Sequence, residues 1–309
     1  MNFFRGKPLV IIAGPTAVGK TASSVRLAQK IGGEIVSADS MQVYRGMDIG
    51  SAKATLEERG GIPHHLLDIL DPWEDFSVAR YQKAAFSVLQ GIYDRGHVPV
   101  LVGGTGFYIQ AVLYDIDFTE EENDPAYRAE LLGTAEKEGA AALYRKLQEI
   151  DPESALSIPE NNVKRVARAL EFHHDTGLRM SEHNARERMK EPPFDYRYFV
   201  LYADRERLYE RINVRVDEML EKGLLSEVKA LRDMGMTEER TSMHAIGYRQ
   251  FLWYLEGRCS YEEAVETIKR ETRRYAKRQL TWFKREKNAR FVDVEKEDLT
   301  DVYENGHLA

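Results

Sequence analysis

The sequence predicts an α/β fold: a parallel sheet built around a phosphate-binding loop (P-loop) and covered by helices, with a helical insertion domain and a helical C-terminal region. Apolar strand-like runs alternate with amphipathic helical segments over residues 1–116, which is typical of a parallel sheet covered on both faces. The motif GPTAVGKT at 14–21 directly follows the apolar run PLVIIA, where a phosphate-binding loop belongs. Beyond residue 117 the strand-like runs stop until DYRYFVLYA at 195–203, which predicts the insertion.

The start of the predicted sheet follows directly from the sequence. The strand PLVIIAG leads through the loop into a helix from about Lys20 to Lys30, which Gly32-Gly33 ends. EIVSAD reads as a second strand with the carboxylate of Asp39 at its C-terminal tip. Ligands of such sheets bind at the carboxyl ends of the strands, so the loop and Asp39 should face one crevice.

The next helix and strand repeat this pattern. Apolar residues recur at helical spacing in FSVARYQKAAFSVLQGIYDRG, and Gly96 closes that helix. VPVLVGGTGFY then gives an apolar strand, a glycine-rich turn and another helix. Thr105 lies in that turn, again at the carboxyl end of a strand, so we expect it in the same crevice.

Two turn-prone segments bound the insertion. The acidic connection TEEENDP precedes it, and Pro192-Pro193 marks the return of the chain to the core. We therefore place the helical insertion domain at 117–191 and the catalytic core at 1–116 and 192–309. After Tyr202 the pattern predicts a mostly helical chain.

Composition describes an ordinary globular protein with an uneven charge distribution. No apolar run is long enough for a membrane span, and the single Cys259 excludes intramolecular disulfides and cysteine-based zinc clusters. We therefore expect a reduced, cytoplasmic protein, and a monomer because no long exposed apolar stripe is evident. The net charge is −7, yet the segment from Lys269 to Arg290 holds ten Lys/Arg and two Glu. That segment indicates either a localised anionic partner or a solvated charged helix.

The spacing of the loop residues predicts a phosphate-binding site with Mg²⁺. Backbone N–H groups at a helix N-terminus attract anions, Lys20 adds a positive charge, and the Thr21 hydroxyl is placed to hold Mg²⁺. The predicted binding residues are Gly14, Pro15, Thr16, Ala17, Val18, Gly19, Lys20 and Thr21.

A carboxylate that a standard NTPase needs is missing beside this loop. Such enzymes carry a metal-binding Asp at the end of a neighbouring apolar strand. Here VPVLV ends in Gly103-Gly104-Thr105-Gly106, and Leu66-Leu67-Asp68 is too short a run to serve. The pattern favours a ligand whose diphosphate leaves as a unit.

A series of motifs resembles the tRNA dimethylallyltransferase (tRNA isopentenyltransferase) family, bacterial type. The motifs occur in order over nearly the whole chain: GPTAVGKT, SADSMQVYRGMDIGSAK, PHHLLD, FSVARYQ, LVGGTGFYIQA, RVARALE, ERINVRVDEML, HAIGYRQ and YAKRQLTWF. The resemblance implies transfer of a dimethylallyl group from dimethylallyl diphosphate to N6 of the adenosine 3′-adjacent to the anticodon, at position 37. The acceptors would be tRNAs that read codons starting with U, and diphosphate would be released.

The resemblance also implies catalytic roles. Asp39 would accept the proton that leaves the adenine amine, which is a poor nucleophile. Lys20 and Arg215 would hold the diphosphate, and Thr105 would orient the diphosphate or the nucleotide. Structural alternatives stay open, because Asp39 could cap a helix and Thr105 could serve a turn. Arg215 also belongs to a row with Arg207 and Arg211 that could be a solvated helix face.

Contacts with tRNA are implied for three segments of the chain, because the target base must leave its stack and the surrounding loop must be held. The implied residues are Asp39, Ser40, Met41, Gln42 and Thr105 in the core; Arg128, Lys164, Arg165 and Arg168 in the insertion; and His244, Gly247, Tyr248, Arg249, Arg274 and Arg278 in the C-terminal region.

Three other functions share parts of this pattern. A small-molecule kinase would share the loop but needs ATP and a second metal carboxylate. An adenylate isopentenyltransferase would share the catalytic core, yet it has less need of an insertion or a basic C-terminal segment. An RNA-binding protein with a degenerate phosphate site is disfavoured because Gly14, Gly19, Lys20, Thr21 and Asp39 are all intact.

Overall fold

The computed structural model describes residues 3–118 and 124–306, and the chain forms two compact units. The larger unit comprises Met1–Leu113 and Pro193–Ala309, and the smaller one Tyr114–Pro192. The sequence-based division at 117 and 191 differs from these bounds by a few residues. Most of the acidic connection TEEENDP lies outside the described residues.

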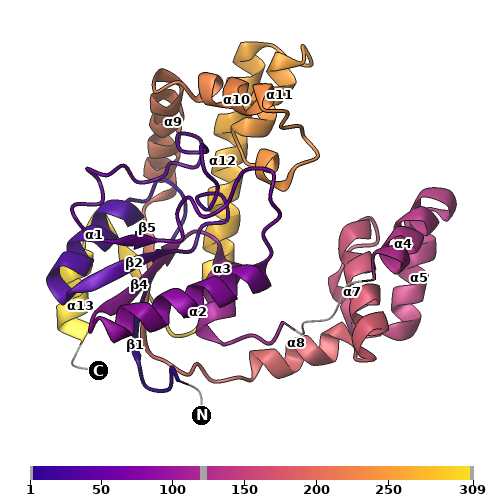
Figure 1. The fold of residues 1–309 in the computed structure, drawn as a ribbon, viewed down its shortest axis with the longest axis horizontal. Helices are drawn as coiled ribbons and strands as arrows, with labels where there is room; N and C mark the ends of the chain where they lie inside the picture. The colour runs from indigo at the N-terminus through magenta and orange to yellow at the C-terminus, as the bar shows by residue number, and fades with distance from the viewer. Residues whose placement is uncertain (1–2, 119–123, 307–309) are drawn as a thin grey trace. The chain divides into compact units, whose positions relative to one another are not determined.

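A parallel sheet forms the centre of the larger unit (Figure 1). Within the described residues it has six strands in the order β3-β2-β4-β1-β5-β6. The strands are β1 (Pro8–Ala13), β2 (Gly33–Ser37), β3 (His64–His65), β4 (Val98–Gly103), β5 (Asp195–Tyr202) and β6 (Ala289–Asp293). Every pairing is parallel, which confirms the predicted fold class.

One face of the sheet is covered by helices from both ends of the chain. Buried Val10 and Ile12 of β1 pack in one apolar cluster with residues of α1 (Lys20–Ile31), α9 (Arg205–Glu221), α12 (Tyr261–Phe283) and α13 (Leu299–Asn305). Helices α1 and α13 lie side by side (Figure 1). Helices α2 (Val78–Asp94) and α3 (Gly106–Leu113) pack together, and α2 also contacts β2 and β4. Burial between helical layers explains why the strand sequences are continuously apolar.

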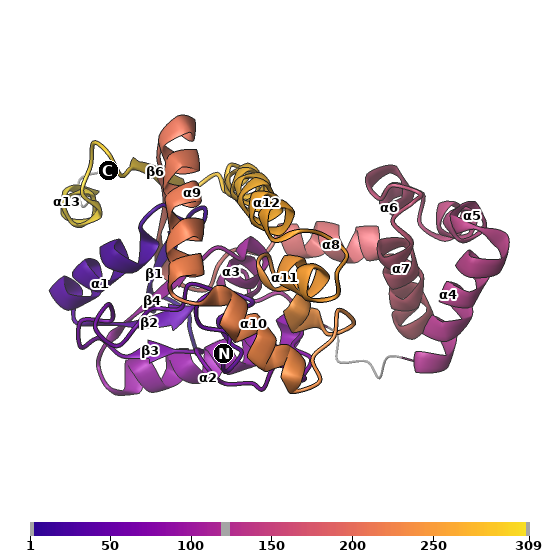
Figure 2. The ribbon, with the colours of Figure 1, turned by 90° about the horizontal axis from the view of Figure 1, so that it is seen from above.

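A second core joins the segment after β2 to the C-terminal helices. Val43, Tyr44 and Met47 pack with residues of α9, α10 (Leu224–Asp233), α11 (Tyr248–Leu255) and α12. The short 3₁₀ helix η1 (Thr241–His244) precedes α11. Figure 2 shows α9, α10, α11 and α12 grouped beside the sheet. The segment after β2 is thus held by residues about 200 positions away in the chain.

The sequence did not predict two of the strands, β3 and β6. The sequence suggested a mostly helical chain after Tyr202, but β6 pairs with β5 at the edge of the sheet. β3 is only two residues long and pairs with Ile35 and Val36. Its His65 Nε2 lies 2.6 Å from Glu34 Oε2, and His64 Nδ1 lies 2.8 Å from the Ile62 carbonyl oxygen. Both strands are short and lie at the edges, so they lack the long apolar run of a central strand.

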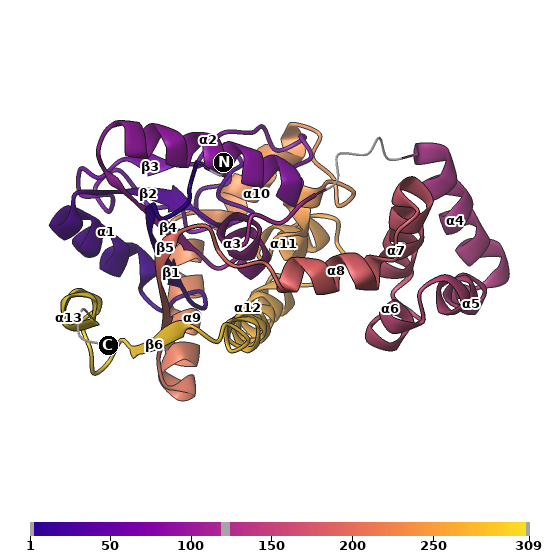
Figure 3. The same cartoon turned by 90° about the horizontal axis from the view of Figure 1, so that it is seen from below.

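The smaller unit is helical. Its helices are α4 (Pro125–Glu138), α5 (Ala140–Ile150), α6 (Pro152–Ser157), α7 (Val163–Thr176) and α8 (Met180–Arg188), and Figure 3 shows them from below. Leu143, Leu147, Val166 and Leu170 are at its apolar centre. The buried Asp151 carboxylate accepts hydrogen bonds from the backbone and hydroxyl groups of two serines, Ser154 and Ser181, and so joins the start of α6 to α8.

No helix in the described ranges is long and apolar enough to span a membrane.

Candidate active site

A cleft of about 1380 Å³ opens at the carboxyl ends of the strands of the larger unit. Its lining includes the phosphate loop, the segment 39–42 that follows β2, the end of β4, and residues of α9 and α12. Sequence position alone predicted that the loop and Asp39 would share such a crevice, and both line the cleft.

The phosphate loop is shaped by close packing and by left-handed backbone. A Cβ at Gly14 would lie 2.6 Å from the Leu201 carbonyl oxygen, so the loop passes β5 only with glycine there. Gly19 has φ 97° and forms the N-cap of α1. Thr16, Ala17, Gly19, Lys20 and Thr21 line the cleft. Gly14, Pro15 and Val18 are buried behind it, so these three shape the loop.

Lys20 is held inside the loop. Its ammonium donates to the carbonyl oxygens of Gly14 at 3.0 Å and Pro15 at 2.8 Å. Burial and the positive charge of Arg215 lower the pKa of Lys20 to about 8, and Asp39 acts in the opposite direction. A cation that is both desolvated and repelled by a second cation would be stabilised by an anionic ligand.

The arginine row on α9 divides into two kinds of residue. Arg207 and Arg211 line the cleft but are each paired with a carboxylate, Arg207 with Glu210 at 3.5 Å and Arg211 with Glu295 at 3.4 Å. Arg215 lines the cleft, and within the described residues it makes no hydrogen bond or ion pair with another side chain. Burial lowers its pKa, and the charge of Asp39 raises it. Arg215 is therefore available to a ligand in the cleft.

Asp39 lies in a turn that extends from β2. Its Oδ1 accepts the N–H of Met41 at 2.9 Å, and no helix begins there, so the helix-capping alternative is wrong. Thr105 Oγ1 accepts the N–H of Ser40 at 3.1 Å, and the N–H of Thr105 donates to the Ala38 carbonyl at 3.1 Å. A Cβ at Gly103 would lie 2.0 Å from that carbonyl oxygen, so the two strand ends touch. Thr105 thus fixes the Asp39 turn and is not itself a lining residue.

The segment after Asp39 forms one wall of the cleft, here called the acceptor wall and comprising residues 39–53. Ser40, Met41 and Gln42 all line the cleft. The Gln42 amide is engaged, because its Oε1 accepts from Ser37 Oγ at 3.1 Å and its Nε2 donates to the Ser51 carbonyl at 3.2 Å. Gln42 therefore folds the wall back on itself.

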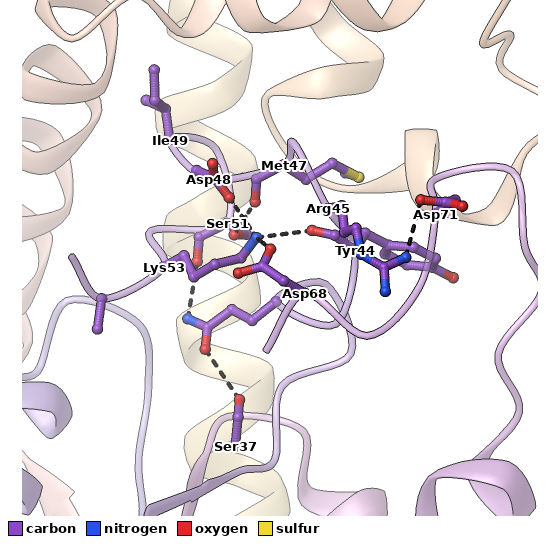
Figure 4. Close-up of polar contacts among 12 residues, drawn as sticks. Ser37, Tyr44, Arg45, Met47, Asp48, Ile49, Ser51, Lys53, Asp68 and Asp71 are labelled. Atoms are coloured by element: carbon purple, nitrogen blue, oxygen red, sulfur yellow. Dashed lines mark hydrogen bonds and ion pairs between the residues drawn. The ribbon is translucent and has the colours of Figure 1, made fainter. Parts of the chain in front are cut away.

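Lys53 secures the same wall from inside (Figure 4). Its ammonium donates to the Tyr44 carbonyl at 2.8 Å and pairs with Asp48 and Asp68 at 2.5 Å each. The Lys53 side chain is only 4% exposed. Sequence reasoning missed this residue, because a lysine among polar residues normally indicates a solvated surface.

Glu227 of α10 secures the wall from outside. Its carboxylate accepts three successive backbone N–H groups, from Asp48, Ile49 and Gly50, at 2.8 to 3.1 Å. It also accepts the Tyr248 hydroxyl at 2.6 Å. Tyr248 is fully buried, and its ring packs so closely against Gly50 that a Cβ there would lie 2.4 Å from a ring carbon. Its contact with tRNA therefore stays a prediction that this packing does not support. Tyr248 supports the wall, and no local motif marked Glu227.

Of the other predicted C-terminal residues, four line the cleft and one does not. His244, Gly247, Arg249 and Arg278 line the cleft. The Arg249 guanidinium lies over the Trp253 ring at 5.2 Å, and that of Arg278 lies over Tyr275 at 5.7 Å. Arg274 pairs with Glu271 at 2.7 Å and is not a lining residue.

The insertion residues that were predicted to contact tRNA fall into two groups, one paired with a buried carboxylate and one exposed. Arg128 Nη1 contacts both oxygens of the Glu171 carboxylate at 2.9 and 2.8 Å, and the Glu171 side chain is only 5% exposed. Lys164, Arg165 and Arg168 are exposed on α7, whose Val166 and Leu170 face the core of the smaller unit. The pairing with a buried carboxylate gives Arg128 a structural role that the sequence did not reveal.

The residues present suit a magnesium ion that arrives with a diphosphate. Within the described residues no group of three or more His, Cys, Asp or Glu could hold a metal. Thr21 lines the cleft, and its hydroxyl makes no hydrogen bond within the same described part of the chain. Mg²⁺ commonly keeps several waters and takes few protein ligands beside substrate phosphates, so this donor set fits it.

Comparison with known proteins gives consistent matches. The family model described as IPP transferase matches residues 42–286, and one described as isopentenyl transferase matches residues 7–68. A tRNA dimethylallyltransferase of Lachnoclostridium phytofermentans is 53% identical over 91% of this chain and 90% of its own length. One from Carboxydothermus hydrogenoformans is 48% identical over 96% of this chain and 95% of its own length.

Solved structures agree. A full-length tRNA isopentenylpyrophosphate transferase from Bacillus halodurans has a TM-score of 0.73 and 46% identity, covering 97% of this chain and 94% of that one. A eukaryotic dimethylallyltransferase acting on tRNA has a TM-score of 0.82 and 31% identity, covering 97% of this chain and 78% of that one. These matches extend over nearly all of the sequence, and the chain belongs to the IPP transferase family.

Proposed function

We propose that this protein is a tRNA dimethylallyltransferase. It transfers a dimethylallyl group from dimethylallyl diphosphate, bound with Mg²⁺, to N6 of adenosine 37, the base 3′-adjacent to the anticodon. The acceptors are tRNAs that read codons starting with U, and diphosphate is released. The names of its relatives support the reaction class, and the cleft supports the roles of individual residues.

One observation carries the proposal: a phosphate loop, the cations of Lys20 and Arg215, and the carboxylate of Asp39 share one cleft. The charge of Asp39 acts on both Lys20 and Arg215, so the three groups lie within electrostatic reach of one another. A kinase would need a metal-binding carboxylate at the end of β4, where the chain has Gly103. The arrangement suits a diphosphate leaving group facing a base.

Groups in this cleft account for each bond, electron pair and proton of the proposed reaction. The adenine N6 forms a bond to C1 of the dimethylallyl group as the bond from C1 to the diphosphate oxygen breaks. The diphosphate keeps the electron pair, and Lys20 and Arg215 stabilise its charge. The proton from N6 passes to the Asp39 carboxylate, which acts as general base. Bound Mg²⁺ would neutralise part of the diphosphate charge, with Thr21 as its protein ligand.

Recognition of tRNA would use exposed cations in both units. Lys164, Arg165 and Arg168 would contact backbone phosphates, and Arg278 and Arg249 would contact the anticodon loop near the cleft. The target adenine must leave its stack to reach Asp39. We further propose that the enzyme works as a monomer, and a tRNA substrate would place it in the cytoplasm.

The test is transfer of labelled dimethylallyl diphosphate to an anticodon stem-loop, with AMP and ATP as parallel acceptors. We expect label on the stem-loop alone, and only when Mg²⁺ is present. Label on free nucleotide would identify an adenylate isopentenyltransferase. If neither acceptor is labelled, the proposed reaction is wrong.

A further inference from the structure

Gln279 of α12 joins the phosphate loop to the turn after β4. Its Oε1 accepts the N–H of Thr16 at 2.9 Å, and its Nε2 donates to the Gly104 carbonyl at 3.0 Å. The residue is only 5% exposed. Both ends of one buried amide are therefore engaged by the backbones of two loops that lie about 90 residues apart in the sequence.

The fit depends on the shape of the partners. A Cβ at Gly104 would lie 2.2 Å from Gln279 Nε2, and a Cβ at Gly106 would lie 2.2 Å from the Trp282 ring. Gln279 and Trp282 are three residues apart on α12, so both project from one face of that helix. Glycine at these two positions lets α12 approach the turn closely enough for the amide to reach both loops.

This bridge continues to the proposed base. The residue after Gly104 is Thr105, whose N–H bonds to Ala38 and whose Oγ1 accepts the N–H of Ser40. Those two residues flank Asp39. The backbone of the phosphate loop is thus connected to the Asp39 turn through Gln279, the 104–105 turn and two further hydrogen bonds.

We propose that Gln279 is a positioning residue that sets the spacing between the bound diphosphate and Asp39. Gln279 lines the cleft, but this role does not depend on contact with either substrate, since its Oε1 and Nε2 are both bonded to backbone groups. The inference rests on the proposed function, in which the loop holds the leaving group and Asp39 takes the proton. Reaction rate depends steeply on such spacing, because displacement of about 1 Å can lower it roughly a hundredfold.

The first experiment compares single-turnover transfer to the stem-loop by wild type and by Gln279→Leu, with both substrates saturating. We expect the rate to fall at least about tenfold while stem-loop affinity stays within about twofold. The matched control is Gln82→Leu, which removes another buried amide that donates to a backbone carbonyl, Ala111, away from the cleft. Gln82→Leu should lose about as much stability as Gln279→Leu does, but it should transfer at the wild-type rate. A Gln279→Leu enzyme that transfers at the wild-type rate overturns the proposal.

A second variant separates positioning from general damage. In Gln279→Glu, an ionised carboxylate still accepts from Thr16 but offers no hydrogen to the Gly104 carbonyl. A protonated carboxyl group restores both bonds, and burial favours that form. We expect the rate of Gln279→Glu relative to wild type to rise as the pH falls from about 8 to about 6. A ratio that does not change with pH overturns the proposal, even if Gln279→Leu is inactive.

Failure of the inference is distinguishable from failure of the proposed function. Wild-type enzyme must label the stem-loop in the same assay. Without that label the proposed function is wrong, whereas normal wild-type transfer with unaffected variants rejects only the role of Gln279.

Discussion

The phosphate loop and the acceptor wall form adjacent sides of one cleft but are built in different ways. The loop is a single stretch, 14–21, whose shape follows from its own glycines and from the helix that begins at Lys20. The wall at 39–53 is mostly irregular backbone, held by Gln42 and Lys53 from within and by Glu227 from α10. The loop, on the proposed donor side, is therefore recognisable as one contiguous motif. The wall, on the proposed acceptor side, is held together by residues that are distant in the sequence.

Charge differs between the two sides as well. On the donor side, Lys20 and Arg215 are desolvated cations, and the charge of Arg215 lowers the pKa of Lys20. On the wall, Lys53 is paired with two carboxylates, and Glu227 is saturated with hydrogen-bond donors. We infer that substrate charge acts on the donor side and that the wall provides shape.

We expect the largest effect from a change at Asp39, where the proposed reaction connects the donor side with the wall. Asp39→Asn keeps the size of the side chain but removes the acceptor for the N6 proton. We expect transfer to fall by roughly 10² to 10⁴-fold, the usual contribution of a general base, while stem-loop affinity stays unchanged. Single-turnover transfer and equilibrium binding on the same preparation measure both. Unchanged turnover would remove Asp39 from catalysis and leave it only a wall residue.

Lys20→Ala tests the donor side alone. Without the ammonium, charge on the departing diphosphate loses a buried partner, and transfer should fall by about 10² to 10³-fold. The control is Lys30→Ala on the same helix, because Lys30 is an exposed residue paired with Glu304. Stem-loop binding should be normal in both variants. A Lys20→Ala enzyme that still transfers would mean that the loop does not hold the leaving group.

The two sides also differ in how much the sequence could predict. The order of loop, strand and helix from Pro8 to Ile31 follows from local pattern, since each element is defined by adjacent residues. The edge strands β3 and β6 have no such pattern, and their pairing depends on the rest of the sheet. Tyr248 lies in a motif that resembles an RNA contact, yet its burial against Gly50 is a long-range packing effect that a motif does not encode.

The pH dependence of donor use should follow Lys20. Its pKa is lowered to about 8, so the free enzyme carries the full ammonium charge below that pH and loses it above. We expect kcat/KM for dimethylallyl diphosphate to decline above about pH 8, approaching tenfold per pH unit. Stem-loop affinity over the same range serves as the control, because it does not depend on Lys20. A profile that stays flat to about pH 10 would contradict the lowered pKa.

A smaller effect should separate two arginines of the basic helix α12. Arg278 lines the cleft, whereas Arg274 does not line it and is paired with Glu271. We expect Arg278→Gln to weaken stem-loop binding about three- to tenfold and to reduce the salt slope by about one. Arg274→Gln should change both quantities less. Equal effects would mean that the whole helix face contacts RNA, and no effect from either would mean a solvated face.

The smallest effect concerns Arg128, where the sequence and the structure suggest different roles. Its guanidinium pairs with the buried Glu171 carboxylate. Arg128→Gln should destabilise the smaller unit by about 1–3 kcal/mol, because the carboxylate would stay buried without its partner. Adding Glu171→Gln removes the charge and should recover most of the loss, as thermal unfolding would show. Arg165→Gln, at an exposed position of α7, should weaken stem-loop binding without changing stability. If Arg128→Gln behaves like Arg165→Gln, the residue contacts RNA despite its ion pair, and structural pairing does not exclude a role in binding.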